Sequence, residues 1–370
     1  MNRRQFLLLA TAGTLGSALG VSALMKHATA ATPQCLYSAS DNPAGGHFLT
    51  RLEISSGTLG SQAVPVRGHA VLPLADGRVL MFGRRPAFEC VAVDFAKSGG
   101  VTPIQATAGR HFDGHGCLSA DGGALFTTES AYDEKRGVLG IRDRKTFQHL
   151  GEYDTHGLDP HDVHLMPDGK TLVVANGGIE QHPDFGRRKL NLDTMQPSLV
   201  YLDAATGKKI DEYRLPDHQL SIRHLLVTPG GDVGAALQYE GDLHRQQPAS
   251  LVAWQHRGGG LELLGINTQA ITPFSGYMAD LAFDPGRNIL AVTSPRGNHV
   301  SFWGVAEQRF LHATPLPEPS GIAFLPEQQV FRVSDATGSL HTLASNRQQA
   351  SASLLRQFPD QLWDNHLVIT

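Results

Sequence analysis

Short runs of alternating apolar and polar residues, separated by tight turns, dominate this chain. The clearest example covers residues 159–176, where Val163 and Leu165 alternate with polar neighbours. Residues 167–170, Pro-Asp-Gly-Lys, then provide a reversal, and residues 171–175 form a β-branched run. An alternating run, a Gly-containing turn and a second β-type run together predict a β-hairpin.

The same pattern recurs along the chain, with first strands beginning near residues 69, 115, 162, 224, 280 and 321. Most of these steps fall in the range of roughly 40 to 50 residues that is typical of four-stranded propeller blades. Most hairpins are followed by a second pair of strand-like runs, which begin at Val91, Val138, Ser198, Leu251 and Val300. Helical repeats need amphipathic helices of about ten residues or more, whereas the apolar residues of this chain alternate in short runs. Helical repeat architectures are therefore excluded.

The two ends of the chain indicate one further blade. Residues 49–59 resemble the outer hairpin of a blade that lacks its other strands, and residues 366–370 form a single apolar strand. Pairing the two ends would close the ring and remove the exposed edge of an open sheet. The sequence therefore predicts an all-β fold, a seven-bladed β-propeller of four-stranded antiparallel blades.

Residues 1–30 are predicted to be a targeting signal, and residues 31–370 a single propeller domain. Arg3 and Arg4 stand in a twin-arginine motif, an apolar stretch follows, and Ala28-Thr29-Ala30 suits a signal peptidase. The alternative is an N-terminal membrane anchor, against which the glycine content and the cleavage site argue. We expect a periplasmic protein, exported in the folded state, without a stable membrane span after processing.

Charge and cysteine content narrow the functional classes. Removal of Arg3, Arg4 and Lys26 leaves 28 basic residues against 35 acidic ones, so a nucleic-acid partner is not expected. The three cysteines, Cys35, Cys90 and Cys117, allow one disulfide, but their spacing does not select the pair.

Hairpin geometry predicts where polar side chains gather. The start of a blade's first strand and the end of its second strand lie on the same face, opposite the Asp-Gly turns, and first strands line the propeller axis. These positions supply the candidate ligand-binding residues His69, His115, His161, Asp162, His224, Asp280, Arg84, Arg223 and Arg296.

Three interpretations of this face remain open. His115, His161, His164 and His224 are candidate ligands of a transition metal such as iron or copper, because neutral imidazole suits these ions. Alternatively, the histidines are structural and hold neighbouring loops by hydrogen bonds. A third interpretation is a small anion bound by Arg84, Arg85, Arg223 and Arg296.

Evidence for catalysis is weak. Glu129 and Glu180 are the only candidates for acid or base chemistry, and a solvated or ion-paired role is the simpler interpretation of both. The long insertion at residues 177–197 has the length of a functional lid or a partner surface. Nucleophile elbows, Cys-x-x-Cys pairs, His-Glu-x-x-His motifs and phosphate-binding loops are absent from the sequence.

Several stretches resemble a known family, the bacterial domain of unknown function 1513. They include GHGCLSADGGALFTTES, PHDVHLMPDGKTLVVANGGIEQHP, KLNLDTMQPSLVYLDAATG, LSIRHL and SPRG. The resemblance covers about residues 35–345 and implies a periplasmic seven-bladed propeller without established activity. It also implies genomic neighbours that are imelysin-type lipoproteins and di-haem peroxidase-like proteins, and hence a role in iron handling.

These observations leave three hypotheses for function. The first is a non-enzymatic periplasmic propeller that binds a metal, an iron-containing ligand or an iron-uptake partner. The second is a metal-assisted hydrolase or oxidoreductase that uses the same histidine and carboxylate face. The third is a protein-interaction scaffold.

Overall fold

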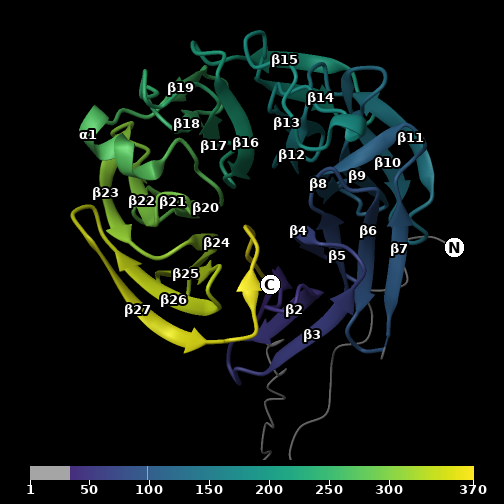
Figure 1. Cartoon of the computed structure of the whole chain (residues 1–370), viewed down its shortest axis with the longest axis horizontal. Coiled ribbons are helices and arrows are strands. Elements are labelled where there is room, and N and C mark those ends of the chain that lie inside the picture. The colour runs from purple at the N-terminus through teal and green to yellow at the C-terminus, as the bar shows by residue number, and fades with distance from the viewer. Residues whose placement is uncertain (1–33, 98) are drawn as a thin grey trace, which may run out of the picture. The chain divides into compact units, whose positions relative to one another are not determined.

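The computed structural model describes residues 34–370 except Ser98, and these residues form seven antiparallel sheets. The sheets follow one another in a ring around a common axis (Figure 1). The predicted seven-bladed propeller is therefore confirmed. The predicted signal at residues 1–30 lies outside the described residues. No helix in the described part of the chain is long and apolar enough to cross a membrane.

Blades 2 to 7 each contain four consecutive strands, as the repeating hairpins predicted. Blade 2 comprises β4 (Gly68–Pro73), β5 (Arg78–Gly83), β6 (Glu89–Asp94) and β7 (Val101–Gln105); blade 3 comprises β8 (Arg110–Leu118), β9 (Ala124–Ala131), β10 (Arg136–Asp143) and β11 (His149–Asp154); blade 4 comprises β12 (Pro160–Leu165), β13 (Thr171–Asn176), β14 (Ser198–Asp203) and β15 (Lys209–Tyr213).

The second half of the ring repeats this arrangement. Blade 5 comprises β16 (Leu220–Val227), β17 (Val233–Tyr239), β18 (Val252–Gln255) and β19 (Leu261–Leu263); blade 6 comprises β20 (Leu281–Asp284), β21 (Ile289–Ser294), β22 (His299–Gly304) and β23 (Arg309–Pro315); blade 7 comprises β24 (Pro319–Leu325), β25 (Val330–Asp335), β26 (Ser339–Ser345) and β27 (Ala350–Gln357). Short helices lie in two connections: η1 (Pro183–Phe185), α1 (Thr268–Ile271) and η2 (Thr272–Phe274).

Blade 1 joins the two ends of the described chain. It contains β1 (Cys35–Asp41), β2 (His47–Glu53) and β3 (Leu59–Val64) from one end, and β28 (Leu362–Trp363) and β29 (Val368–Ile369) from the other. Both C-terminal strands pair with β1, which confirms the predicted closure. The sequence identified the outer hairpin and the last strand but missed β1, and it also missed the β26–β27 pair, whose outer strand is mostly exposed.

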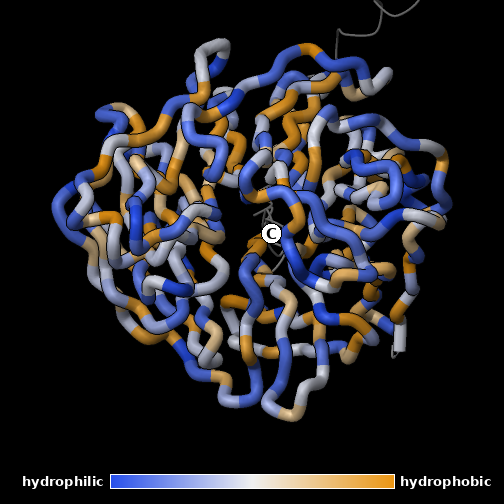
Figure 2. The backbone as a smooth tube through the Cα atoms, turned by 45° about the horizontal axis from the view of Figure 1, so that its top comes forward, coloured by the Kyte–Doolittle hydropathy of each residue, from blue (hydrophilic) through white to orange (hydrophobic). Residues whose placement is uncertain are grey.

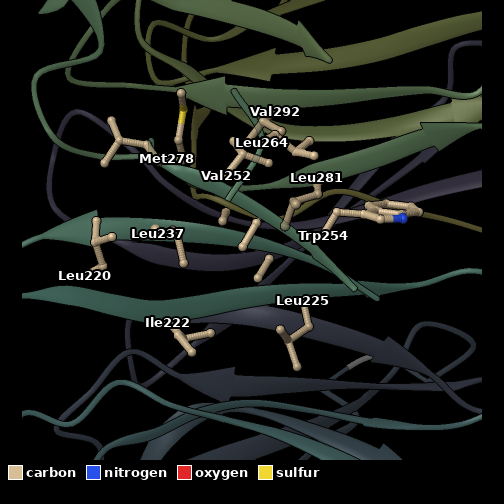
Figure 3. Close-up of a cluster of buried hydrophobic side chains, with 14 of the residues drawn as sticks. Leu220, Ile222, Leu225, Leu237, Val252, Trp254, Leu264, Met278, Leu281 and Val292 are labelled. Atoms are coloured by element: carbon tan, nitrogen blue, oxygen red, sulfur yellow. The ribbon is translucent and has the colours of Figure 1, made fainter. Parts of the chain in front are cut away.

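The hydrophobic core lies between adjacent blades, and both faces of the inner sheets are buried. On β5, Val79 and Met81 pack toward blade 1, whereas Leu80 and Phe82 pack toward blade 3. The largest cluster joins blades 4, 5 and 6, and Figure 3 shows Leu237 and Trp254 of blade 5 within it. Figure 2 shows hydrophobic and hydrophilic stretches interspersed around the ring.

Irregular pairing at the inner strands positions their first side chains. The register between first and second strands shifts around His69 in blade 2, His115 in blade 3, His161 in blade 4 and next to His224 in blade 5. Such β-bulges bend a strand and re-aim a side chain. Gly114 has a φ of +112°, and a Cβ atom there would lie 2.6 Å from the His69 ring, so only glycine fits this bulge.

Candidate metal centre

Four imidazoles from four consecutive blades meet where the inner strands converge. They belong to His69, His115, His161 and His224, and one nitrogen of each lies within 4.8 Å of the others. All four side chains are buried. The sequence placed three of these residues in one metal site and assigned His69 to the same ligand-binding face.

A fifth imidazole, that of His366, completes the cluster from the chain's closing segment. Its ring centroid lies 4.7 Å from those of His69 and His115 and 4.5 Å from that of His224. We refer to these five residues as the histidine cluster. None of them is more than 7% exposed.

The outward-facing nitrogens of four cluster members are fixed by hydrogen bonds. The Nδ1 atoms of three members contact carboxylate oxygens: His69 with Asp364 at 3.3 Å, His115 with Asp162 at 3.2 Å and His366 with Asp280 at 3.0 Å. Nδ1 of His224 donates to the carbonyl oxygen of Ala279 at 2.9 Å. These contacts set the tautomer and the orientation of each ring.

The same carboxylates tie neighbouring blades together. Asp162 of blade 4 accepts a hydrogen bond of 2.8 Å from the backbone N–H of Leu225 in blade 5. Asp280, next to blade 6, accepts one of 2.9 Å from Ile322 in blade 7. The histidines and the aspartates behind them thus share the hydrogen bonds between blades that the structural interpretation predicted.

On the opposite side of the rings, three nitrogens lack a partner and two others pair with each other. Nε2 of His69, His115 and His366 is buried and lacks a hydrogen bond. Nε2 of His161 lies 2.9 Å from Nε2 of His224, and Nδ1 of His161 has no partner. The 2.9 Å separation is that of an N–H···N hydrogen bond, and it is also short enough for both nitrogens to bind one metal ion, since metal–nitrogen distances are about 2.0–2.1 Å.

Electrostatics favours neutral rings in most of the cluster. Burial lowers the pKa of His69, His115, His161 and His224. Burial is also the largest influence on His366 and opposes its protonation, but the charge and hydrogen bond of Asp280, together with the charges of Asp162 and Asp364, raise that pKa overall. Neutral imidazoles keep a lone pair, which is the form that binds transition metals.

Other predicted residues take different places. Asp162 and Asp280 stand behind cluster histidines rather than among the inward-facing groups. His164, which the sequence grouped with the metal ligands, lies outside the cluster; its side chain is 39% exposed and its Nε2 contacts Asp162 at 3.3 Å. Arg84, Arg223 and Arg296 line a cavity beside the cluster.

Neither predicted acid–base candidate faces the cluster. The carboxylate of Glu129 is buried beside blade 2, where it accepts hydrogen bonds from Arg142 at 2.9 Å and from Thr127 at 2.6 Å. Its place at a channel mouth was therefore wrong, because its position on β9 turns it toward the neighbouring blade. Glu180 forms a 2.8 Å ion pair with Lys135, which matches the simpler interpretation.

Sequence reasoning missed His366 and Asp364, both in the closing segment. A signal for His366 was present: His366-Leu367-Val368-Ile369 repeats the pattern of residues 224–227, a histidine followed by an apolar run. Asp364 had no such signal, because its contact with His69 joins residues 295 positions apart. The disulfide that the cysteine count allowed is not formed, since Cys90 and Cys117 are both buried free thiols.

The fold and the site define a class: a seven-bladed β-propeller with a histidine cluster between its inner strands. The chain belongs to the family described as protein of unknown function DUF1513, whose model matches residues 62–370. The comparison with curated proteins finds no match. Among solved structures, hydrazine synthase of Kuenenia stuttgartiensis is similar, with a TM-score of 0.60 and 15% identity over 87% of this chain and 95% of that chain. At this identity the likeness shows the fold alone.

Proposed function

We propose that this propeller binds one transition-metal ion within the histidine cluster. The observation that carries the proposal is the two-sided arrangement of the rings. One nitrogen of each of four rings is held by Asp364, Asp162, Asp280 or a backbone carbonyl. Nitrogens of His69, His115, His161 and His224 also lie within 4.8 Å of one another. A histidine held by a carboxylate from behind is the usual outer support of a metal ligand. A purely structural cluster would leave at least three buried nitrogen atoms without a partner, which is costly.

We propose iron or copper as the metal. The inward-facing donors are imidazole nitrogens, with carboxylates only behind them, and such a set suits Fe, Cu, Zn and Ni better than Mg or Ca. Copper(II) has the highest affinity of the divalent series for nitrogen sites, so iron occupancy would depend on which metal is supplied during folding.

Metal analysis tests this proposal. Protein purified after export should contain close to one equivalent of iron or copper, and metal-stripped protein should rebind one of them in a titration. The His115→Ala, His224→Ala double variant should bind neither, while its circular dichroism spectrum shows a folded propeller. Wild-type protein that is metal-free and fails to bind either ion would refute the proposal.

A metal-assisted enzyme is the second candidate, because one side of the cluster is open. His69 and His161 line the adjacent cavity, so a small molecule in it would reach the metal. A metal ion there would supply Lewis acidity or an activated water. Metal-loaded wild-type protein should then turn over a member of a lactone, phosphoester and redox panel, and the double variant should not. A metal-loaded protein without turnover favours the binding function.

We further propose that the protein works in the periplasm, in iron handling. The twin-arginine motif supports the export step, and the role in iron handling rests on what the family resemblance implies. Replacing Arg3 and Arg4 by lysine should retain the protein in the cytoplasmic fraction. Candidate partners are imelysin-type lipoproteins and di-haem peroxidase-like proteins, and titration of each purified partner with metal-loaded and metal-free propeller would test them. If neither partner binds, the proposed partners are refuted, and the protein would carry its metal without them.

A further inference from the structure

A cavity of about 440 Å³ opens beside the histidine cluster and is strongly basic. We call it the basic chamber, and it is defined by six cationic residues, Arg84, Arg85, Arg187, Lys189, Arg223 and Arg296. The loop at residues 177–197, which the sequence marked as a functional insertion, contributes Arg187 and Lys189. Of the remaining four cations, Arg84 and Arg85 follow β5, Arg296 follows β21, and Arg223 lies within β16 at its β-bulge.

The positive charge of the chamber is only partly neutralised. Asp159 pairs with both Arg85 and Arg223, the latter at 2.7 Å. Asp364 pairs with Arg84 at 2.9 Å, and Glu240 pairs with Lys189. Three carboxylates thus pair with four of the six cations, and the charge of buried Asp113 also acts on Arg85 and Arg223.

Two arginines at the rim remain available. Within the described part of the chain, neither Arg187 nor Arg296 forms an ion pair with a carboxylate. The guanidinium of Arg296 lies 4.7 Å from the ring centre of Tyr277, which restrains it at the chamber wall. Burial, together with repulsion from Arg84, lowers the pKa of Arg187. A bound anion would relieve the repulsion between Arg187 and Arg84.

The floor of the chamber is polar and incompletely satisfied. Nε of Arg223 is buried without a partner, and that side chain is 7% exposed. His69 and His161 form part of the same lining, and each has one buried nitrogen without a hydrogen bond. Donors on the walls and lone pairs on the floor therefore surround one enclosed space.

From this arrangement we propose that the basic chamber binds a small organic polyanion with two or more carboxylate or phosphate groups. One anionic group contacts the rim arginines Arg187 and Arg296, because guanidinium groups bind such oxygens in bidentate fashion. The other group reaches the floor and the metal held by the histidine cluster. The first contact stands independently, and the second rests on the proposed metal site. A volume of about 440 Å³ exceeds the space that one inorganic phosphate fills.

Calorimetric titration of citrate, inorganic phosphate and neutral glucose tests the proposal. Citrate should bind the metal-loaded protein best, phosphate should bind more weakly, and glucose should not bind. The Arg187→Gln, Arg296→Gln double variant should lose at least tenfold in citrate affinity. Arg188→Gln removes the same charge from the neighbouring position of the loop, outside the chamber lining, and should change the affinity less than twofold.

Failure of this inference is distinguishable from failure of the metal proposal. Metal content and thermal unfolding are measured for each variant, and both should match wild type in the rim variants. Citrate binding by metal-free protein supports the rim contact even if no metal is ever bound. Equal citrate affinity with and without metal overturns the contact between ligand and metal. Equal affinities for citrate and glucose would refute the proposal that the basic chamber binds a polyanion. Equal losses of citrate affinity in Arg188→Gln and in the double variant would refute it as well.

Discussion

Two kinds of histidine–aspartate pair occur in this propeller, and their comparison separates support from site. In blade 7, Nε2 of His341 contacts Asp335 at 2.8 Å, and Asp335 also accepts hydrogen bonds from the backbone of Thr337 and Ser339. In the centre, His115 contacts Asp162, which likewise accepts hydrogen bonds from backbone N–H groups. The carboxylate has the same structural role in both places.

The difference lies in the second ring nitrogen. His341 has no buried ring nitrogen lacking a partner, whereas Nε2 of His115, and that of His69 and His366, is buried and has none. A fold does not gain stability from several unsatisfied nitrogens directed at one another. The comparison teaches that an aspartate contact identifies a supported histidine, and that several unpaired nitrogens gathered at one place identify candidate ligands.

Removing a central ring should produce the largest effect. We expect His115→Ala to lower metal affinity by more than about a hundredfold, because replacing a ligand costs more than the ten- to hundredfold that is typical of its supporting group. His341→Ala is the matched control and should keep wild-type affinity. Competition titrations with a chromogenic chelator measure both. Equal losses of metal affinity in the two variants would show that the central and the peripheral histidines do not differ as ligands.

Removing a supporting carboxylate should come next. Asp280→Asn keeps the shape but weakens the contact to His366 and the hydrogen bond from Ile322, so metal affinity should fall by about ten- to hundredfold. Asp335→Asn changes the corresponding group in blade 7 and should leave metal affinity unchanged. The same chelator competition applies, and an unaffected Asp280→Asn protein would show that His366 does not take part.

The peripheral pair should affect stability instead. His341→Ala removes a hydrogen bond to a buried carboxylate, which should cost about 1–3 kcal/mol of unfolding free energy at neutral pH. Burial opposes ionisation of Asp335, but its hydrogen bonds with His341 and the backbone lower its pKa overall. A lowered pKa stabilises the fold above the ordinary carboxyl pKa and loses this effect as pH falls. The difference between variant and wild type in urea unfolding should therefore shrink below about pH 4.

The smallest effect should come from His164. Its ring lies on the far side of Asp162 from His115, and its side chain is 39% exposed. His164→Ala should therefore change metal affinity less than about threefold, since the ligand and its support both remain. Chelator competition at one metal concentration is sufficient. A loss as large as that of His115→Ala would return His164 to the ligand set that the sequence suggested.

By itself the sequence determined the repeated blade. Alternating apolar residues and Asp-Gly turns are local signals, and they fixed the hairpins, the seven-bladed ring and the axial face on which His69, His115, His161 and His224 begin their strands. The family resemblance rested on the same stretches.

Only the tertiary structure decided which side chains form a centre. Ring closure brings His366 and Asp364 next to residues almost three hundred positions earlier, and β-bulges turn individual rings inward. The tertiary structure also separated candidate ligands from the groups that support them. Asp162 and His164 share a strand face, but Asp162 supports His115 and His164 lies outside the histidine cluster. Contacts between distant segments depend on how the blades close around the axis, and local periodicity carries no record of that geometry.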